Sequence, residues 1–197
     1  MREVELKAVV DDLAGARKRL EKAGAKLVFE GSLSDSRYDV ESRELAERDE
    51  VLRVRRYEAP GSSKTYLEWK GPTEIQDVYK IREEISTLVE DFESLTRILN
   101  SLGFIVTMEI DREVAQYELG GAMLRFETYP RMDVLVEIEG EPDSIELAIE
   151  ALGMPRGLFN SDRLPGFVER FEQRTGVRAA ICARELEGDY SFRVEQP

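Results

Sequence analysis

The sequence predicts an α+β protein whose centre is a closed eight-stranded antiparallel β-barrel with flanking helices. About eight segments have the composition or the alternation of β-strands, and only short helical segments interrupt them. Several strands place charged residues of both signs on one face and apolar residues on the other, as in Glu3-Val4-Glu5-Leu6-Lys7. Eight strands enclose an interior wide enough for one small ligand, so we expect these charged faces to line a tunnel.

The strands are expected where β-branched, aromatic or alternating residues mark a segment. They cover residues 2–10, 26–40, 50–58, 64–70, 78–87, 104–118, 122–129 and 134–140. A Pro-Gly turn at 59–63 joins the third and fourth strands, and Gly120-Gly121 marks a tight turn between the sixth and seventh. The polar segments 41–49 and 71–76 are expected to be connections, the first a loop or a short helix.

Four helices are expected where apolar residues recur at helical spacing. They cover about residues 12–23, 92–102, 143–152 and 163–174. Asp11 or Asp12 caps the first helix, and Gly24 and Gly103 end the first two. These amphipathic helices can cover an apolar outer face of the barrel. The tail after Gly176 is left open between a strand and partial disorder.

Composition limits the class of protein. A chain of 197 residues fits one domain, here expected over residues 1–175, with a C-terminal extension over 176–197. The net charge of −13 argues against a nucleic-acid-binding surface, and no apolar run approaches the ~20 residues of a membrane helix. A start without a signal-peptide pattern and a single cysteine, Cys182, favour a cytoplasmic protein. The oligomeric state is left open, with a homodimer as one option.

The chain contains no histidine. This excludes Ser-His-Asp and Cys-His catalysis and any zinc site with histidine ligands. A bound metal would therefore be a hard ion held by carboxylates, such as Mg²⁺, Mn²⁺ or Ca²⁺.

Paired glutamates on two strands are the best metal candidates. Glu3 and Glu5 share one strand face, and Glu137 and Glu139 share another, so the members of each pair lie roughly 6.5–7 Å apart. Two such pairs on neighbouring strands could hold one or two divalent ions that also bind substrate phosphates. The alternative is that both pairs lie on a solvated face, and spacing alone leaves that alternative open.

Basic residues recur on strand faces opposite apolar residues, and guanidinium groups match phosphate oxygens. The candidate anion-binding residues are Lys7, Arg53, Arg55, Lys70, Arg82, Arg112 and Arg125. Each one alone could be an ordinary exposed strand residue, and it is their joint recurrence that favours a site. Glu84 and Glu127 accompany these bases and could bind metal, orient an arginine or simply neutralise it.

These residues resemble the CYTH family, also called triphosphate tunnel metalloenzymes, which includes CyaB-type class IV adenylyl cyclases and thiamine and inorganic triphosphatases. Five elements occur in the family's order: the E-x-E-x-K that begins at Glu3, L-R-x-R, K-G-P, R-x-E and the second E-x-E. The last four stand here as Leu52-Arg53-Val54-Arg55, Lys70-Gly71-Pro72, Arg82-Glu83-Glu84 and Glu137-Ile138-Glu139. Arg112 fits the arginine of the sixth strand. One such motif is weak, whereas five in order are specific.

The resemblance implies a CYTH-like tunnel over residues 1–175 that holds Mg²⁺ or Mn²⁺ and a small-molecule triphosphate. By analogy, Glu3, Glu5, Glu137 and Glu139 bind metal, with Glu84 and Glu127 as secondary metal or positioning groups. The seven basic residues named above bind phosphates. A lysine–tyrosine pair is thought to activate water in the family's triphosphatases, which assigns Lys70 and Tyr38 as catalytic residues.

The chain departs from the family pattern at three places. Glu127 stands where an aspartate is common, and Ile110 stands where a basic residue is common. The usual D-x-Y of the second strand corresponds to Asp35-Ser36-Arg37-Tyr38, so Arg37 takes the tyrosine position. Tyr38 then faces the other way unless a local bulge returns it to the tunnel.

The resemblance implies an enzyme that acts on a nucleotide, thiamine or inorganic triphosphate, and we place phosphohydrolysis first. The first alternative is a class IV adenylyl cyclase that makes cyclic AMP and pyrophosphate from ATP. The second alternative is a non-catalytic protein that binds triphosphate or polyphosphate.

Overall fold

Eight antiparallel strands close into a barrel because the first strand pairs with a neighbour on each side. The computed structural model describes the backbone of residues 2–192 and the side chains of residues 4–192. Strand β1 (Arg2–Val9) pairs with β9 (Leu135–Glu139) and with β6 (Tyr79–Val89). Around the ring the order is β1-β9-β8-β7-β2-β3-β4-β6, which confirms the predicted barrel.

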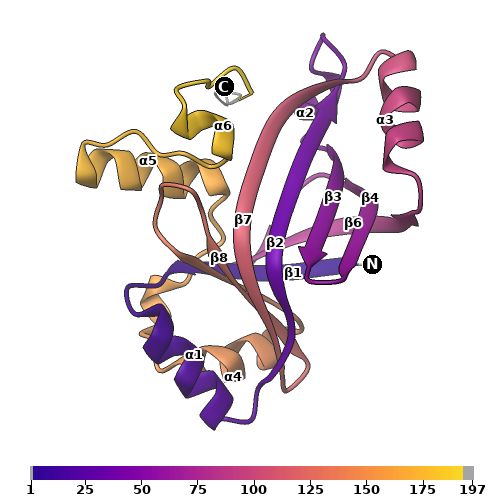
Figure 1. Ribbon diagram of the computed structural model, residues 1–197. Helices are drawn as coiled ribbons and strands as arrows, with labels where there is room; N and C mark the ends of the chain where they lie inside the picture. The colour runs from indigo at the N-terminus through magenta and orange to yellow at the C-terminus, as the bar shows by residue number, and fades with distance from the viewer. Residues whose placement is uncertain (1, 193–197) are drawn as a thin grey trace.

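The remaining strands of the ring lie close to their predicted positions. They are β2 (Lys26–Asp39), β3 (Val51–Ala59), β4 (Ser62–Lys70), β7 (Ile105–Leu119) and β8 (Ala122–Thr128). The long strands β2 and β7 run side by side over most of their length (Figure 1). Gly120 and Gly121 join β7 to β8 with φ values of 56° and 86°, the left-handed conformation that a two-residue hairpin turn requires.

Six α-helices lie among the described residues. They are α1 (Leu13–Lys22), α2 (Glu44–Glu47), α3 (Phe92–Ser101), α4 (Pro142–Leu152), α5 (Leu164–Thr175) and α6 (Ala183–Leu186). The Asp12 carboxylate accepts a hydrogen bond from the Gly15 N–H at 2.9 Å, so Asp12 is the predicted cap of the first helix. Helices α1 and α4 lie together at one end of the barrel, and α5 and α6 lie beside β7 and β8 (Figure 1).

Two connections carry structure that the sequence pattern did not predict. The segment expected to be a loop at 71–76 contains a short strand, β5 (Glu74–Gln76), which pairs only with β6. In the tail, Ala180 and Arg131 exchange two backbone hydrogen bonds, and α6 follows. The prediction left the tail open between a strand and partial disorder, and its described part contains a short helix at 183–186. Residues 193–197 lie outside the described residues.

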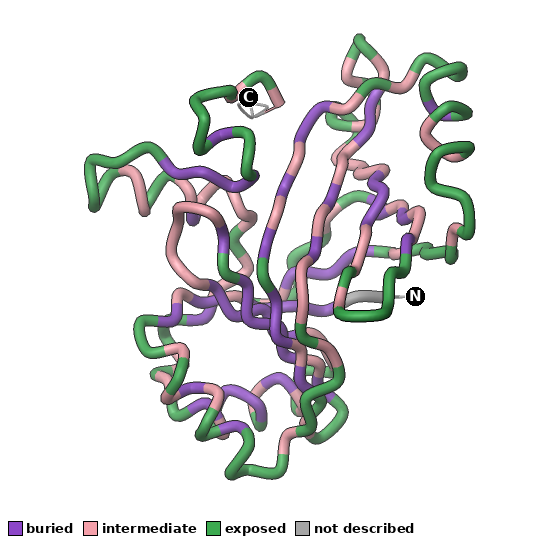
Figure 2. Tube along the Cα trace, in the orientation of Figure 1, coloured by how far each residue is buried: buried purple, intermediate pink, exposed green. Residues whose placement is uncertain are grey.

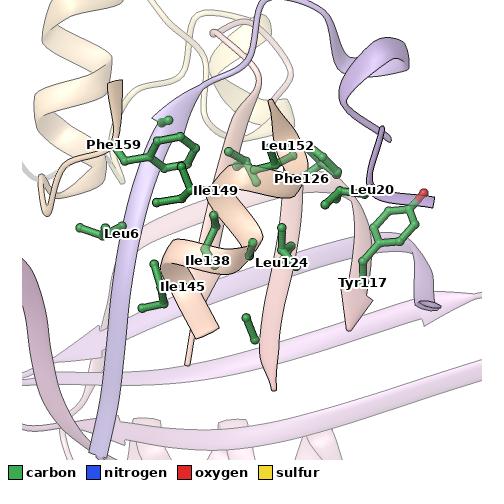
Figure 3. Close-up of a cluster of buried hydrophobic side chains, with 14 of the residues drawn as sticks. Leu6, Leu20, Tyr117, Leu124, Phe126, Ile138, Ile145, Ile149, Leu152 and Phe159 are labelled. Carbon is green, nitrogen blue, oxygen red and sulfur yellow. The ribbon is translucent and has the colours of Figure 1, made fainter. Parts of the chain in front are cut away.

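The barrel is apolar outside and charged inside. On β1, Leu6 and Ala8 point outward into the main hydrophobic cluster, whereas Glu5 and Lys7 point into the interior. Buried positions follow the barrel strands, and exposed positions gather on the outer faces of the helices (Figure 2). Helix α4 turns Ile145 and Ile149 towards the strands that carry Leu6, Leu124 and Ile138 (Figure 3). Helix α4 thus removes this part of the outer apolar face from water, which leaves the barrel interior free for polar groups.

Replacing Ile138 with alanine tests how much this outer core stabilises the fold. Ile138 is fully buried under α4, so Ile138→Ala should lower the free energy of unfolding by ~2–5 kcal/mol, as lost burial plus a cavity. Urea denaturation followed by circular dichroism measures the change. The matched control is Ile98→Ala on the exposed face of α3, which should change the value by about 0.5 kcal/mol or less. Equal effects of the two substitutions would contradict the assignment of the core.

Candidate functional site

The barrel interior contains a cavity of about 710 Å³ with a positively charged lining. Eight Asp and Glu residues line it, against a larger set of eleven Lys and Arg residues. The basic residues are Lys7, Arg37, Arg43, Arg53, Arg55, Lys70, Lys80, Arg82, Arg112, Arg125 and Arg163. A chain with a net charge of −13 thus encloses an excess of positive charge, which suits an anionic ligand.

Three carboxylates converge on one wall of this interior. Glu5 lies opposite Glu139 in the pairing of β1 with β9, and Lys7 lies opposite Glu137. Oxygens of Glu5, Glu137 and Glu139 lie within 4.8 Å of one another. We call these three residues the carboxylate trio. The fourth predicted ligand, Glu3, lies on β1 opposite Arg82, and its side chain lies outside the described residues.

Basic side chains contact all three carboxylates of the trio. Lys7 Nζ lies 3.1 Å from Glu5 and 2.6 Å from Glu137, Lys80 contacts Glu5, and Arg125 contacts Glu137. Burial alone would raise the pKa of Glu5, but Lys7 and Lys80 outweigh it and hold that pKa well below its usual range. A cluster of carboxylate oxygens fits a hard divalent cation such as Mg²⁺ or Mn²⁺.

Asp35 on β2 organises the arginines of the opposite wall. Its carboxylate accepts two hydrogen bonds from Arg55, at 2.8 and 3.0 Å, and a further one from Arg112. Arg53 lies 3.6 Å away. Burial would raise the pKa of Asp35, but Arg55, Arg112 and Arg53 together hold it well below its usual range. One buried anion therefore fixes the positions of three predicted phosphate-binding residues.

Glu127 on β8 acts as a second buried counter-ion. It lies 3.2 Å from both Arg112 and Arg125 and accepts a hydrogen bond of 2.7 Å from the Tyr129 hydroxyl. Burial opposes its ionisation, but Arg112 and Arg125 lower its pKa to about 2. These contacts hold arginines in place, while the metal role that the resemblance implies for Glu127 stays a prediction.

The other predicted residues reach the interior from β4 and β6. Lys70 lines the cavity at the end of β4, 3.5 Å from Glu84. Arg82 donates a hydrogen bond of 2.6 Å from Nε to the Gly71 carbonyl. All seven predicted anion-binding residues therefore line one cavity.

Glu84 and Glu139 lie at the far end of the barrel interior. Both line a second cavity of about 660 Å³, together with the acidic side chains of Glu118 and Glu141 and the turn at Gly120-Gly121. Glu5 and Glu137 line the first cavity instead. The carboxylate trio thus lies where the two cavities approach each other.

Tyr38 lies on the face of β2 opposite to that of Arg37. The register between β2 and β7 shifts at Arg37 and Tyr38, but the extra residue, Thr107, lies on β7. The pairing of β2 with β3 continues unbroken, so Tyr38 keeps the face opposite Arg37 and packs in a hydrophobic cluster, although it also borders the cavity. Its catalytic role stays a prediction.

The sequence prediction omitted several charged residues of the interior. Lys80 and Glu68 each stand two residues from a predicted site residue on the same strand face, Arg82 and Lys70 respectively, so alternation alone could have found them. Glu68 contacts Arg53 at 2.5 Å. Asp35 and Arg37 belong to a strand with few other charges, and Asp35 meets its partners only through the fold.

A closed barrel with a cation-rich interior and a cluster of carboxylates is the architecture of a charged β-barrel tunnel. A family model of the CYTH domain matches residues 1–151, which is most of the chain. The chain belongs to the CYTH domain family.

Three relatives illustrate the similarity. A Methanocaldococcus jannaschii protein provisionally named an adenylate cyclase is 34% identical over 104 residues, 53% of this chain and 57% of the relative. The match thus spans little more than half of the relative's length. A provisionally named adenylate cyclase of Vibrio parahaemolyticus has a TM-score of 0.72 at 17% identity over 85% of this chain and 97% of its own. HpAC1 from Hippeastrum has a TM-score of 0.57 at 16% identity, over 89% of this chain and 95% of its own.

None of the helices within residues 2–192 combines the length and the apolar character that crossing a bilayer requires.

Removing the charge of Asp35 tests its role as the organising anion. Asp35→Asn leaves Arg55 and Arg112 buried without their carboxylate, so the free energy of unfolding should fall by ~3–5 kcal/mol. Chemical denaturation at neutral pH measures the loss. Asp133→Asn is the control, because Asp133 pairs with an exposed arginine, Arg174, and should cost ~1 kcal/mol or less. A loss at Asp35 no larger than in the control would show that the buried network does not depend on this carboxylate.

Proposed function

We propose that this protein is a divalent-metal-dependent phosphohydrolase that acts on a triphosphate. The observation that carries the proposal is that seven predicted phosphate-binding cations line one cavity, beside the carboxylate trio, two of whose members line the same cavity. A linear triphosphate carries about four negative charges near neutral pH, so several cations and a metal held by the carboxylates can bind it without net repulsion.

Glu5, Glu137 and Glu139 would hold Mg²⁺ or Mn²⁺, because all three offer carboxylate oxygens within 4.8 Å of one another. When bound, the ion supplies positive charge that polarises phosphoryl oxygens. Lys7 contacts two of the three carboxylates, so it links the metal ligands to the phosphate-binding residues. The metal-ligand role of Glu3 and the secondary roles of Glu84 and Glu127 stay part of this proposal.

The arginines bind the phosphate chain and stabilise the charge that grows in the transition state. Arg55 and Arg112 are already oriented by Asp35, so little reorganisation is needed when the substrate binds. Lys70 points into the same cavity, where its ammonium group could orient a water molecule for attack on the terminal phosphorus. The active site therefore works chiefly by positioning and by electrostatic stabilisation.

Cyclisation of ATP is the second candidate function. One side of the cavity is apolar, with Met108, Ile110, Tyr129, Leu164 and Pro165 in its lining, and such a wall suits a purine base. All three relatives carry provisional names as adenylate or adenylyl cyclases, and the description of the Hippeastrum protein reports a dominant triphosphatase activity for that protein. Hydrolysis comes first here because it needs only the phosphate-binding half of the cavity.

Product analysis separates the functions. The purified protein is incubated with tripolyphosphate, ATP and thiamine triphosphate, each with Mg²⁺ or Mn²⁺. We expect release of inorganic phosphate that stops when EDTA removes the metal. Cyclic AMP and pyrophosphate from ATP would instead assign the cyclase, and tight calorimetric binding without any product would assign a non-catalytic binder.

Glu137→Gln tests the metal ligands. The substitution keeps the size of the side chain but removes one anionic oxygen donor, so metal-dependent turnover should fall by at least ~100-fold. Glu150→Gln on the exposed face of α4 is the control and should retain the parent rate. Thermal melting must show that the Glu137 variant is folded, and unchanged turnover in a folded variant would remove Glu137 from the site.

A further inference from the structure

Two basic residues of the main cavity differ from all the others. Nine of the eleven have a carboxylate within ion-pair distance, but Arg37 and Arg43 have none among the described residues. Both belong to the junction of β2 and α2, since Arg37 is near the end of β2 and Arg43 directly precedes α2. The protein therefore leaves two positive charges in this part of the cavity without a counter-ion.

Arg37 is poorly neutralised and partly desolvated. It lies opposite Arg53 in the pairing of β2 with β3, and its Nε atom is buried without a hydrogen-bond partner. Burial and the nearby charge of Arg53, together with Arg112 and Arg82, lower the pKa of Arg37 to about 10. The guanidinium still carries its charge at neutral pH, and an unpaired charge in such surroundings is costly.

The two acids on the same strand face, Asp35 and Asp39, form no ion pair with Arg37, although the nearby charge of Asp35 partly offsets that of Arg37. The Asp35 carboxylate is taken by Arg55 and Arg112. The Asp39 carboxylate accepts hydrogen bonds from the backbone N–H groups of Val40, Leu45 and Ala46, at 2.8–3.1 Å, and so holds the start of α2. Each carboxylate is engaged elsewhere, and the charge of Arg37 stays available to a ligand.

Arg43 is held at the cavity by an unusual backbone conformation. Its φ of 63° lies in the left-handed region, which is uncommon for residues other than glycine. Asp39 fixes the helix that follows, so the position of Arg43 at the cavity lining is set by the fold.

The location of this junction relative to the carboxylate trio follows from the strand order. In the closed ring, β2 is the fourth strand from β1 in either direction, so the two strands face each other across the interior. The trio lies on β1 and β9. A phosphate chain that reaches the trio at one end thus has Arg37 on the opposite wall.

We propose that Arg37 and Arg43 form an anion subsite that binds a phosphate group of the substrate at the β2–α2 junction, opposite the carboxylate trio. The subsite rests on the proposed function, because it needs a substrate with several phosphates. Its chemistry favours a substrate that is anionic along its whole length, as inorganic tripolyphosphate is. A neutral nucleoside at this position would leave both guanidinium groups without a partner.

Arg37→Gln and Arg43→Gln, alone and combined, test the subsite. Steady-state kinetics with tripolyphosphate and with ATP should show KM for tripolyphosphate raised ~10–100-fold in the double variant, with a smaller change in kcat, as for a lost charge-assisted hydrogen bond. The KM for ATP should rise less. The control is Arg48→Gln, since Arg48 is the exposed residue at the other end of α2 and is not part of the cavity lining.

Thermal melting separates substrate binding from a structural role. Without ligand, Arg37→Gln should melt at the same temperature as the parent or higher, because an unpaired cation is removed, whereas the stabilisation by added tripolyphosphate should shrink. A lower melting temperature without ligand and an unchanged KM would assign Arg37 a structural role and overturn the subsite. Equal effects on both substrates would overturn the preference for tripolyphosphate. Failure of the parent protein to bind or cleave any triphosphate would instead overturn the proposed function.

Discussion

The ion pairs buried inside the barrel are the constraint on which the rest of the structure depends. Asp35 and Glu127 lie deep in the interior, and each is surrounded by arginines that come from other strands. Each carboxylate stays charged there because its arginine partners offset the cost of removing it from water. The network therefore requires that β2, β3, β7 and β8 meet in one register, and it links the stability of the barrel to the geometry of its binding site.

A charged interior forces the hydrophobic core to the outside of the barrel. Val4, Leu6 and Ala8 alternate with the interior residues of β1, and they pack against α4 and the elements around it. A second cluster joins α5 and the C-terminal extension to β7, through Phe167, Ile181 and Met108. The helices are thus part of what makes the interior usable, because they bury the apolar surface that the strands turn away from the cavity.

Most of the barrel and much of the site could be predicted from the sequence because both follow from strand alternation. The two-residue alternation of the strands assigned Glu5, Lys7 and Glu137 to inward faces. The five motifs in family order predicted that the strands form a closed barrel. Contacts between distant segments were not accessible in this way. Asp35 meets Arg112 across 77 positions of the chain, and nothing near Asp35 in the sequence indicates that partner. The tail could not be predicted either, since the pairing at Ala180 depends on a tertiary contact with Arg131.

The linings of the two cavities give the two ends of the barrel opposite charge. The larger one carries an excess of cations, while the smaller one, beyond the carboxylate trio, is lined by four glutamates and one lysine, Lys26. A polyanion that reached the acidic end would meet net repulsion, because four glutamates outnumber the one lysine there. We therefore expect phosphate-rich molecules to arrive and depart through the same basic opening, whereas the glutamate-lined opening admits water and small cations.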